Sequence, residues 1–331
     1  MKAIVQDRYG SPDVLELMEL DKPLPAAKEV LVRVHAAAVN ARDWHVMRGD
    51  PYIARLMLPS VFGFSGPKRR IRGRDFAGRV EAVGPEVTRF RPGDEVYGDL
   101  GNADGAFAEY VCAPDETLEP KPANLTFEQA AAMPLAGNTA LMGLRDVGRV
   151  QPGQQVLING ASGGVGTFAV QIAKSFGAEV TAVCSTRNVD LVRSLGADHV
   201  IDYTREDFAR GGRRYDVVFD LVGNRSLTEF RRALTPAGTL VMSGGGVSGG
   251  GSPVGPMGLL IRGQALSPFV RHRLLALTES PGRENLAALR ELAESGKVTP
   301  VIDRTYQLSQ VPEAIRYLEV EHARAKVVIT V

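Results

Sequence analysis

The stretch from residue 155 to residue 176 has the spacing of a loop that could hold a phosphate group. A short apolar strand, QVLIN, is predicted to end at Asn159, and an apolar-striped helix is predicted over Gly164–Phe176. Glycine lets the chain turn tightly and lets its backbone approach an anion, and the N–H groups of a helix start then face that anion. The pattern predicts a dinucleotide site whose loop consists of Gly160, Ala161, Ser162, Gly163, Gly164, Val165 and Gly166.

The loop departs from the G-x-G-x-x-G pattern at one position. Ala161 stands where the first glycine is usual, while Gly163 and Gly166 hold the other two places. A lone match of this kind is a weak signal, but the strand before it, the helix after it and the alternation that follows supply the expected context. We therefore favour dinucleotide binding over a purely structural turn.

The end of the second predicted strand, Glu179–Val183, distinguishes between the two nicotinamide dinucleotides. An NAD site usually has Asp or Glu here to bond the ribose 2′-hydroxyl, whereas this chain has Ser185, Thr186 and Arg187 and no carboxylate before Asp190. Hydroxyl and guanidinium donors complement a 2′-phosphate that a carboxylate would repel. We expect NADPH rather than NADH, the alternative being an ordinary solvated loop.

Alternating strands and helices must position these loops. After residue 124, short buried strands alternate with helical segments, which predicts a parallel sheet covered on both faces. The first 120 or so residues instead contain short strands separated by glycine and proline, which favours an antiparallel, barrel-like unit. A glycine- and serine-rich connection, Ser243–Gly251, precedes a tail that again contains strands.

Length and composition limit the class of protein. The chain has 331 residues, which indicates about two domains, and 39 basic against 38 acidic residues give a net charge of +1. Two cysteines exclude a disulfide framework. No apolar signal core or membrane-length run is present, so we expect a soluble, cytoplasmic protein that binds neither nucleic acid nor membrane. The basic run at 68–74 is predicted to be a solvated loop.

Several short motifs follow one another along the whole chain in a characteristic order. They are EVLVRVHAAAVNARDW from Glu29, GRDFAGRVEAVGPEV from Gly73, RPGDEVYG from Arg91, AAMPLAGNTA from Ala131 and HARAKVVI from His322. Together they resemble the zinc-free branch of the medium-chain dehydrogenase/reductases, the quinone oxidoreductase-like (zeta-crystallin-like) family. The resemblance implies an α/β homodimer with a GroES-like β-rich catalytic domain, residues 1–123 and 276–331, and a Rossmann-like doubly wound parallel-sheet domain, residues 124–275.

The same comparison separates the chain from zinc alcohol dehydrogenases of the superfamily. Those enzymes place a catalytic cysteine where Asn40 stands and a His-Glu pair where Arg74-Asp75 stands, and no cysteine lies near Met133–Thr139. Asparagine and arginine are not zinc ligands, so we expect no zinc. Without a metal to lower the pKa of a bound alcohol, alcohol oxidation is disfavoured.

The resemblance also implies further site residues, each with an ordinary structural alternative. Asn40 is a catalytic candidate or an Asx turn, and Tyr52 is a catalytic candidate or a packed aromatic. Cofactor contacts are implied at Thr139, Tyr203, Ser243, Gly244 and Lys326. For Tyr203 the alternative is a surface tyrosine, and for Lys326 a solvent-facing lysine.

The reaction implied is hydride transfer from NADPH to a quinone or an α,β-unsaturated carbonyl in a dry cleft. Two alternatives stay open: an alcohol or ketone dehydrogenase of the same superfamily, and an NADPH-binding protein with little turnover.

Overall fold

The computed structural model spans the whole chain and describes all residues except 51–54, 56–60, 64–65, 244–256, 279–281 and 322. It divides into two compact units, Met1–Asn138 with Ser280–Val331, and Thr139–Glu279. The predicted divisions at 123 and 275 fall earlier in the chain. One reason is that the helix α3 (Phe127–Ala131) packs on strands β3 (Glu29–Val39) and β4 (Asp75–Val83) of the first unit.

The second unit is built on a six-stranded sheet in which every pairing is parallel. Its strands are β8 (Gln155–Asn159), β9 (Glu179–Cys184), β10 (His199–Asp202), β11 (Tyr215–Asp220), β12 (Leu234–Met242) and β13 (Arg273–Ala276). The spatial order β10-β9-β8-β11-β12-β13 is the doubly wound order, in which ligands bind beyond the carboxyl ends of the strands where the order reverses. That reversal lies between β8 and β11.

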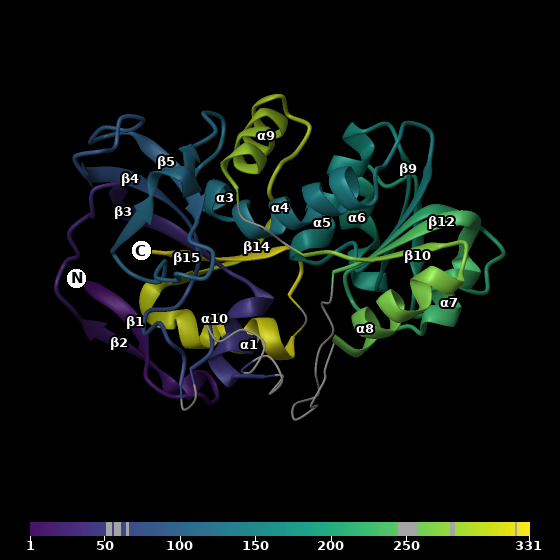
Figure 1. Cartoon of the computed structure of the whole chain (residues 1–331), viewed down its shortest axis with the longest axis horizontal. Helices are drawn as coiled ribbons and strands as arrows, with labels where there is room; N and C mark the ends of the chain where they lie inside the picture. Colours follow the sequence, from purple (N-terminus) through teal and green to yellow (C-terminus); the bar gives the residue numbers. More distant parts are fainter. Residues whose placement is uncertain (51–54, 56–60, 64–65, 244–256, 279–281, 322) are drawn as a thin grey trace. The chain divides into compact units, whose positions relative to one another are not determined.

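Helices cover both faces of this sheet. In Figure 1, α5 (Gly164–Ser175) and α6 (Val189–Ser194) lie on one side of the sheet, and α7 (Leu227–Ala233) and α8 (Met257–Leu266) lie on the other. Val156, Leu157 and Ile158 of β8 are fully buried, as the apolar strand sequence predicts for a sheet covered on both faces.

The first unit is built on a mostly antiparallel sheet to which both of its chain segments, Met1–Asn138 and Ser280–Val331, contribute strands. Its order is β14-β15-β3-β4-β5-β7, with β6 also paired to β3, and β1 and β2 form a separate hairpin. The bounds not yet given are β1 (Lys2–Gln6), β2 (Leu15–Glu19), β5 (Glu95–Asp99), β6 (Tyr110–Pro114), β7 (Leu118–Pro120), β14 (Ile302–Gln307) and β15 (Lys326–Thr330). The C-terminal strand β15 therefore lies beside β3 (Figure 1).

The other α-helices in the described part of the chain are α1 (Ala41–Arg48), α4 (Pro134–Leu141), α9 (Arg283–Glu294) and α10 (Val311–Val320). A capping box begins α3, because the Thr126 hydroxyl accepts from the N–H of Gln129 and the Gln129 side chain accepts from the N–H of Thr126. A six-residue π-helical stretch, Met142–Val147, follows α4.

A buried carboxylate links helix α9 to the N-terminal segment of the first unit, Met1–Asn138. Glu119 on β7 accepts from Arg89 at 2.7 Å and from Arg290 of α9 at 3.2 Å, and Arg283 lies 3.5 Å away. The hydroxyl of Tyr97 on β5 also donates to the backbone oxygen of Leu286 at 2.6 Å. Three arginine side chains thus share one carboxylate that is almost excluded from water.

The prediction that the basic run at 68–74 is a solvated loop is wrong for two of its residues. Lys68, Arg69 and Arg70 are exposed, but Arg72 and Arg74 are only 1% and 3% exposed. The burial of these two guanidinium groups is compensated by carboxylates that arrive from later segments of the chain, as described below.

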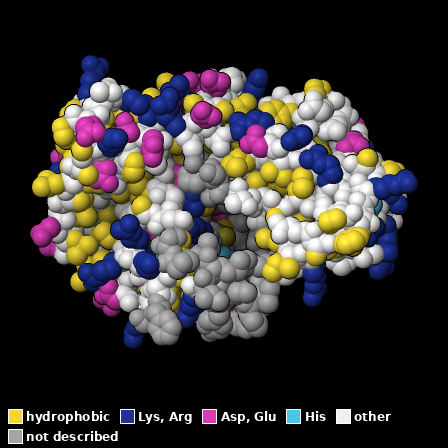
Figure 2. Space-filling model, in the orientation of Figure 1, with side chains coloured by type: hydrophobic (Ala, Val, Ile, Leu, Met, Phe, Trp, Pro, Cys, Tyr) yellow, Lys and Arg dark blue, Asp and Glu magenta, His cyan; other side chains and the backbone are white. Residues whose placement is uncertain are grey.

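On the face shown in Figure 2, Lys and Arg are interspersed with Asp and Glu, in keeping with the near-zero net charge. None of the helices in the described part of the chain has the length and apolar character that crossing a bilayer requires.

Candidate functional site

The glycine loop forms a tight turn and leaves an open space at the start of α5. Gly160 follows β8 with φ +88°, a conformation that favours glycine. A Cβ at Gly166 would lie 2.1 Å from the Gly160 oxygen, so only glycine lets α5 pack this close to the turn. A Cβ at Gly163 would meet only the Gly160 oxygen, at 3.4 Å. Gly163 therefore borders space in front of N–H groups that lack partners within the helix, which fits a phosphate.

Ala161 explains why the first glycine of the pattern is dispensable here. Its N–H donates to the Val183 oxygen of β9 at 3.0 Å, and its side chain is fully buried. Because its φ is not positive, unlike that of Gly160, an alanine fits this position without backbone strain. The loop is therefore bonded to the neighbouring strand at the position where it departs from the pattern.

Asn188 connects this loop to the end of the second strand, and the sequence analysis missed it. Its side-chain amide donates to the hydroxyl oxygen of Ser162 at 2.9 Å and to that of Ser185 at 3.2 Å. Since both oxygens act as acceptors, the two hydroxyl hydrogens are left to donate to another group. Asn188 is only 4% exposed, so it holds the two serines from inside the molecule.

The other predicted hydroxyl donor at the strand end is already engaged. Thr186 donates to the carboxylate of Asp202, at the end of β10, at 2.5 Å. This hydrogen bond holds the pKa of Asp202 below its ordinary value. Thr186, Arg187 and Tyr203 are all exposed, but the hydroxyl hydrogen of Thr186 is engaged by Asp202 rather than left for a phosphate.

The carboxyl ends of β8 and β11 are held together by a polar network. The buried Asn159 side chain donates to the buried carboxylate of Asp220 at 2.8 Å and to the exposed Asn224 at 3.0 Å, and the backbone oxygen of Asp220 accepts the N–H of Ser243 at 3.0 Å. Burial raises the pKa of the Asp220 carboxyl. The network fixes the edge of the sheet that carries the glycine loop. Gly244, the next predicted residue, lies outside the described residues.

In the first unit, Asn40 lies in a second polar cluster at the ends of three strands. Its side-chain amide donates to Asp75 at 3.0 Å, and its Oδ1 accepts from Lys326 at 2.5 Å. Lys326 also lies 3.6 Å from Asp75. All three side chains are buried, so Lys326 is not the solvent-facing lysine considered as an alternative. The backbone N–H of Asn40 donates to Asp43 at 2.7 Å, which fixes the start of α1.

Burial disfavours the charged forms of the titratable side chains in this cluster. It raises the pKa of Asp75 to about 7, against the lowering effect of Lys326. Burial likewise lowers the pKa of Lys326 and raises that of Asp43. The two oxygens of Asp75 accept from Asn40 and from the N–H of Leu135 at the start of α4, contacts that favour the carboxylate.

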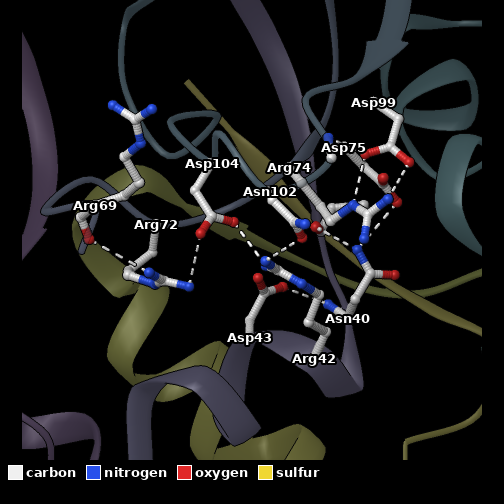
Figure 3. Close-up of polar contacts among 12 residues, drawn as sticks. Asn40, Arg42, Asp43, Arg69, Arg72, Arg74, Asp75, Asp99, Asn102 and Asp104 are labelled. Carbon is white, nitrogen blue, oxygen red and sulfur yellow. Dashed lines mark hydrogen bonds and ion pairs between the residues drawn. The ribbon is translucent and has the colours of Figure 1, made fainter. Parts of the chain in front are cut away.

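Further ion pairs continue the cluster in a row across the unit (Figure 3). Arg74 meets Asp99 through two hydrogen bonds of 2.6 and 2.5 Å. Asp104 binds Arg42 at 2.7 Å and Arg72 at 3.0 Å. Each buried cation therefore has a carboxylate nearby, which is the condition for tolerating such charges inside a protein.

The donor groups around Asn40 do not fit a divalent metal. A zinc ion needs thiolate, imidazole or carboxylate ligands. Here the ammonium of Lys326 contacts Asn40, and the guanidinium of Arg74 occupies the position next to Asp75. No group of three or more His, Cys, Asp or Glu is arranged to hold a metal within the described ranges of the chain. Burial raises the pKa of both thiols, Cys112 and Cys184, to about 11.

The structure brings some of the predicted site residues together and leaves others apart or undescribed. Ser162 and Ser185 meet through Asn188, and Asn40 meets Lys326. Thr139 is buried on α4. Tyr52 lies outside the described residues. Two residues of the cluster were not predicted from sequence: Asp75 stands there only as a replaced metal ligand, and Asp43 could have been indicated by the N-x-x-D spacing of a helix cap.

Comparison with known proteins agrees with this architecture. The alcohol dehydrogenase GroES-like domain matches residues 26–123, and the zinc-binding dehydrogenase family matches residues 195–329. A chloroplastic quinone-oxidoreductase from Triphysaria versicolor is 33% identical over 99% of this chain and 98% of its own length. A 2-methylene-furan-3-one reductase from Solanum lycopersicum is 37% identical over 99% and 79%.

Solved structures give the same result. The quinone oxidoreductase from Coxiella burnetii has 33% identity and a TM-score of 0.87, covering 100% of this chain and 99% of its own. The Escherichia coli quinone oxidoreductase complexed with NADPH has 27% identity and a TM-score of 0.83 over 100% of both chains. The chain belongs to the quinone oxidoreductase-like medium-chain dehydrogenase/reductases.

Family membership confirms the predicted fold class, a GroES-like β-rich domain with a Rossmann-like domain. A structure described as an NAD-dependent alcohol dehydrogenase is also similar, with 32% identity and a TM-score of 0.85 over 100% of both chains. Membership of this family therefore does not by itself distinguish NADPH from NADH.

Proposed function

We propose that this chain is a zinc-independent, NADPH-dependent reductase that transfers a hydride to a quinone or an α,β-unsaturated carbonyl. The observation that carries the proposal is the open space at Gly163 together with the hydroxyls of Ser162 and Ser185, whose oxygens accept from Asn188 and whose hydrogens are left to donate. The names of the similar proteins, a quinone-oxidoreductase and a 2-methylene-furan-3-one reductase, support the acceptor class.

The second unit supplies the cofactor contacts in this proposal. The N–H groups at the start of α5 and the Ser162 hydroxyl would hold the pyrophosphate, and Ser185 with the exposed Arg187 would hold the 2′-phosphate. The bound cofactor would supply the hydride at its nicotinamide ring. The NADPH complex of the similar Escherichia coli enzyme supports this choice of cofactor.

The zinc-independent part rests on the donor set around Asn40. Although one matching family is described as zinc-binding, the ammonium of Lys326 contacts Asn40, the residue that replaces the catalytic cysteine. A divalent ion placed there would be repelled by that ammonium and by Arg74. We therefore propose that reduction proceeds without metal activation of the acceptor.

Several assignments stay predictions. They are the substrate contacts of Asn40 and Tyr52, the cofactor contacts of Thr139, Tyr203, Ser243, Gly244 and Lys326, a homodimer, and a cytoplasmic location. The acceptor within the quinone and enone class is also open.

The function is tested by a panel in which NADPH or NADH absorbance is followed with small quinones, enones and simple ketones, and with alcohols in the oxidising direction. We expect turnover with NADPH and at least one quinone or enone, and no alcohol oxidation. Metal analysis of the purified protein should give well below one zinc per chain. Tight NADPH binding with no acceptor reduced would favour a binding protein, and alcohol turnover with bound zinc would favour a dehydrogenase.

The 2′-phosphate contact has its own test. Arg187→Glu should raise the Kd of NADPH by at least about tenfold, since a charge-assisted hydrogen bond is replaced by repulsion, and should change that of NADH little. Arg193→Glu on α6 is the matched control, because it makes the same charge change at an exposed residue beyond the strand end. Equal weakening of both cofactors by Arg187→Glu would refute the assignment.

A further inference from the structure

The cluster around Asn40 is assembled by strand register. Lys326 begins β15, which pairs Val327 with Val39, the residue before Asn40. Asp75 begins β4, which pairs it with Ala38. Three segments far apart in the sequence therefore end at one edge of the sheet, and their polar side chains meet there. Ala325, just before Lys326, has φ +51°, so this approach is made despite local backbone strain.

The hydrogen bonds of Asn40 fix which end of its amide faces which partner. The two N–H groups of an asparagine amide donate, and its oxygen has two lone pairs. Here the nitrogen donates to Asp75 at 3.0 Å and to the Ala38 oxygen at 3.3 Å. The oxygen accepts from Lys326 at 2.5 Å. The opposite orientation would set N–H groups against an ammonium and an oxygen against a carboxylate, so the chemistry of the partners excludes it.

The partners of Asn40 are themselves held in place. Besides Asn40, the ammonium of Lys326 contacts the Val39 oxygen at 3.4 Å and Asp75 at 3.6 Å. The second oxygen of Asp75 accepts the N–H of Leu135 at 3.1 Å. Lys326 and Asp75 are 2% and 0% exposed. Among the described residues, both amide hydrogens of Asn40 are therefore engaged and Oδ1 keeps one lone pair, since the N–H of Asp43, although part of the capping box, completes no hydrogen bond to this side chain.

We propose that Lys326 and Asp75 are positioning residues that lock the amide of Asn40, so that Asn40 can meet a bound reactant only by accepting a hydrogen bond from an O–H or N–H group. The proposal rests on the proposed function in taking Asn40 to contact a reactant. It follows that Asn40 does not polarise the carbonyl oxygen of an enone or quinone. The donor for that oxygen must be another group.

The lock is tested without activity by hydrogen exchange. In ¹⁵N-labelled protein, the side-chain amide of Asn40, assigned by its loss in Asn40→Asp, should exchange far more slowly than that of the exposed Asn102. Lys326→Met should speed its exchange by at least about tenfold, the effect of losing a hydrogen bond to a charged group. The same variant should lower kcat/KM for the acceptor by about 10- to 100-fold.

Two further variants distinguish the positioning of Asn40 by Lys326 from a general effect of removing a charge. Lys174→Met breaks a partly exposed ion pair with Asp198, of 2.8 Å, and should leave both measurements unchanged. Asp75→Asn with Lys326→Met removes both buried charges, so it should fold even if Lys326→Met does not, yet it should keep fast exchange and low kcat/KM. Wild-type exchange in Lys326→Met, or wild-type kcat/KM in the double variant, would overturn the proposal. If the unaltered protein reduces no acceptor, the proposed function fails, while the exchange measurement still decides the lock.

Discussion

Two glycines of the same loop should respond in opposite ways to the addition of one methyl group. At Gly166 the new Cβ would lie 2.1 Å from the Gly160 oxygen and 2.6 Å from the carbonyl carbon of Ala161. Both neighbours are backbone atoms, so α5 or the turn must move. At Gly163 the same Cβ would lie 3.4 Å from the Gly160 oxygen and otherwise face open space.

Gly166→Ala should therefore destabilise the second unit. Overpacking of this kind costs about 3 kcal/mol, which for a domain of this size lowers the melting temperature by roughly 5–12 °C. Gly163→Ala should leave stability close to that of the wild type. The poorer helix cap costs up to about 1 kcal/mol, and the stiffer unfolded chain offsets about 0.4–1 kcal/mol of it. The backbone at Gly163, with φ −81° and ψ 177°, suits alanine.

Binding should show the reverse selectivity. The methyl group of Gly163→Ala would fill the space assigned to the phosphate and remove at least one charge-assisted hydrogen bond. A loss of about 1.5–3 kcal/mol raises the Kd of NADPH by roughly 10- to 150-fold. Thermal melts without cofactor and a fluorescence titration with NADPH measure the two effects. A folded Gly163→Ala variant that binds NADPH like the wild type would refute the placement of the cofactor at this loop.

The remaining predictions concern buried polar groups. Glu119→Gln should destabilise the protein by about 3 kcal/mol in denaturant unfolding, because it leaves clustered arginines without their carboxylate, whereas Glu294→Gln at the surface should cost under about 0.5 kcal/mol; equal effects would contradict this. Asn188→Ala should raise the Kd of NADPH about tenfold by releasing the two serine hydroxyls, and an unchanged titration would count against their role. Lys326→Met should make stability fall more steeply with pH. In the folded protein the pKa of Asp75 is raised from 3.8 to about 7. The stability that the protonated carboxyl contributes is therefore complete below about pH 4 and is lost as pH rises through the folded pKa. Removing the cation of Lys326 raises the folded pKa of Asp75 further. Unfolding curves from about pH 5 to 9 that run parallel for variant and wild type would show that this pair does not interact as described.

Much of the second unit could be predicted from local pattern. The strand Gln155–Asn159 and the start of α5 at Gly164 agree with the sequence analysis because apolar runs, glycine turns and helix periodicity are properties of neighbouring residues. The boundaries between the two units were harder to predict, because they depend on which sheet a helix packs against. For example, α3 belongs to the first unit because of the sheet it covers, which a sequence pattern does not reveal.

The candidate site was only partly predictable. The glycine loop was found because its spacing is itself the signal. Asn188 was missed because its importance comes from two serines, one of them 26 residues away, that fold against it. Thr186 was predicted to donate to a phosphate, since the sequence does not show that its hydroxyl donates to Asp202, a residue at the end of the next strand.

The sequence by itself determined the family, the doubly wound sheet and the glycine turn after β8, since each depends on the order and spacing of residues along the chain. Only the tertiary structure decided the state of the charged groups. The basic run at 68–74 contains two buried arginines because carboxylates from distant segments reach them, and Lys326 lies next to Asn40, which precedes it by 286 residues. Burial and pairing depend on which segments the strand register brings together, and a linear pattern does not record that.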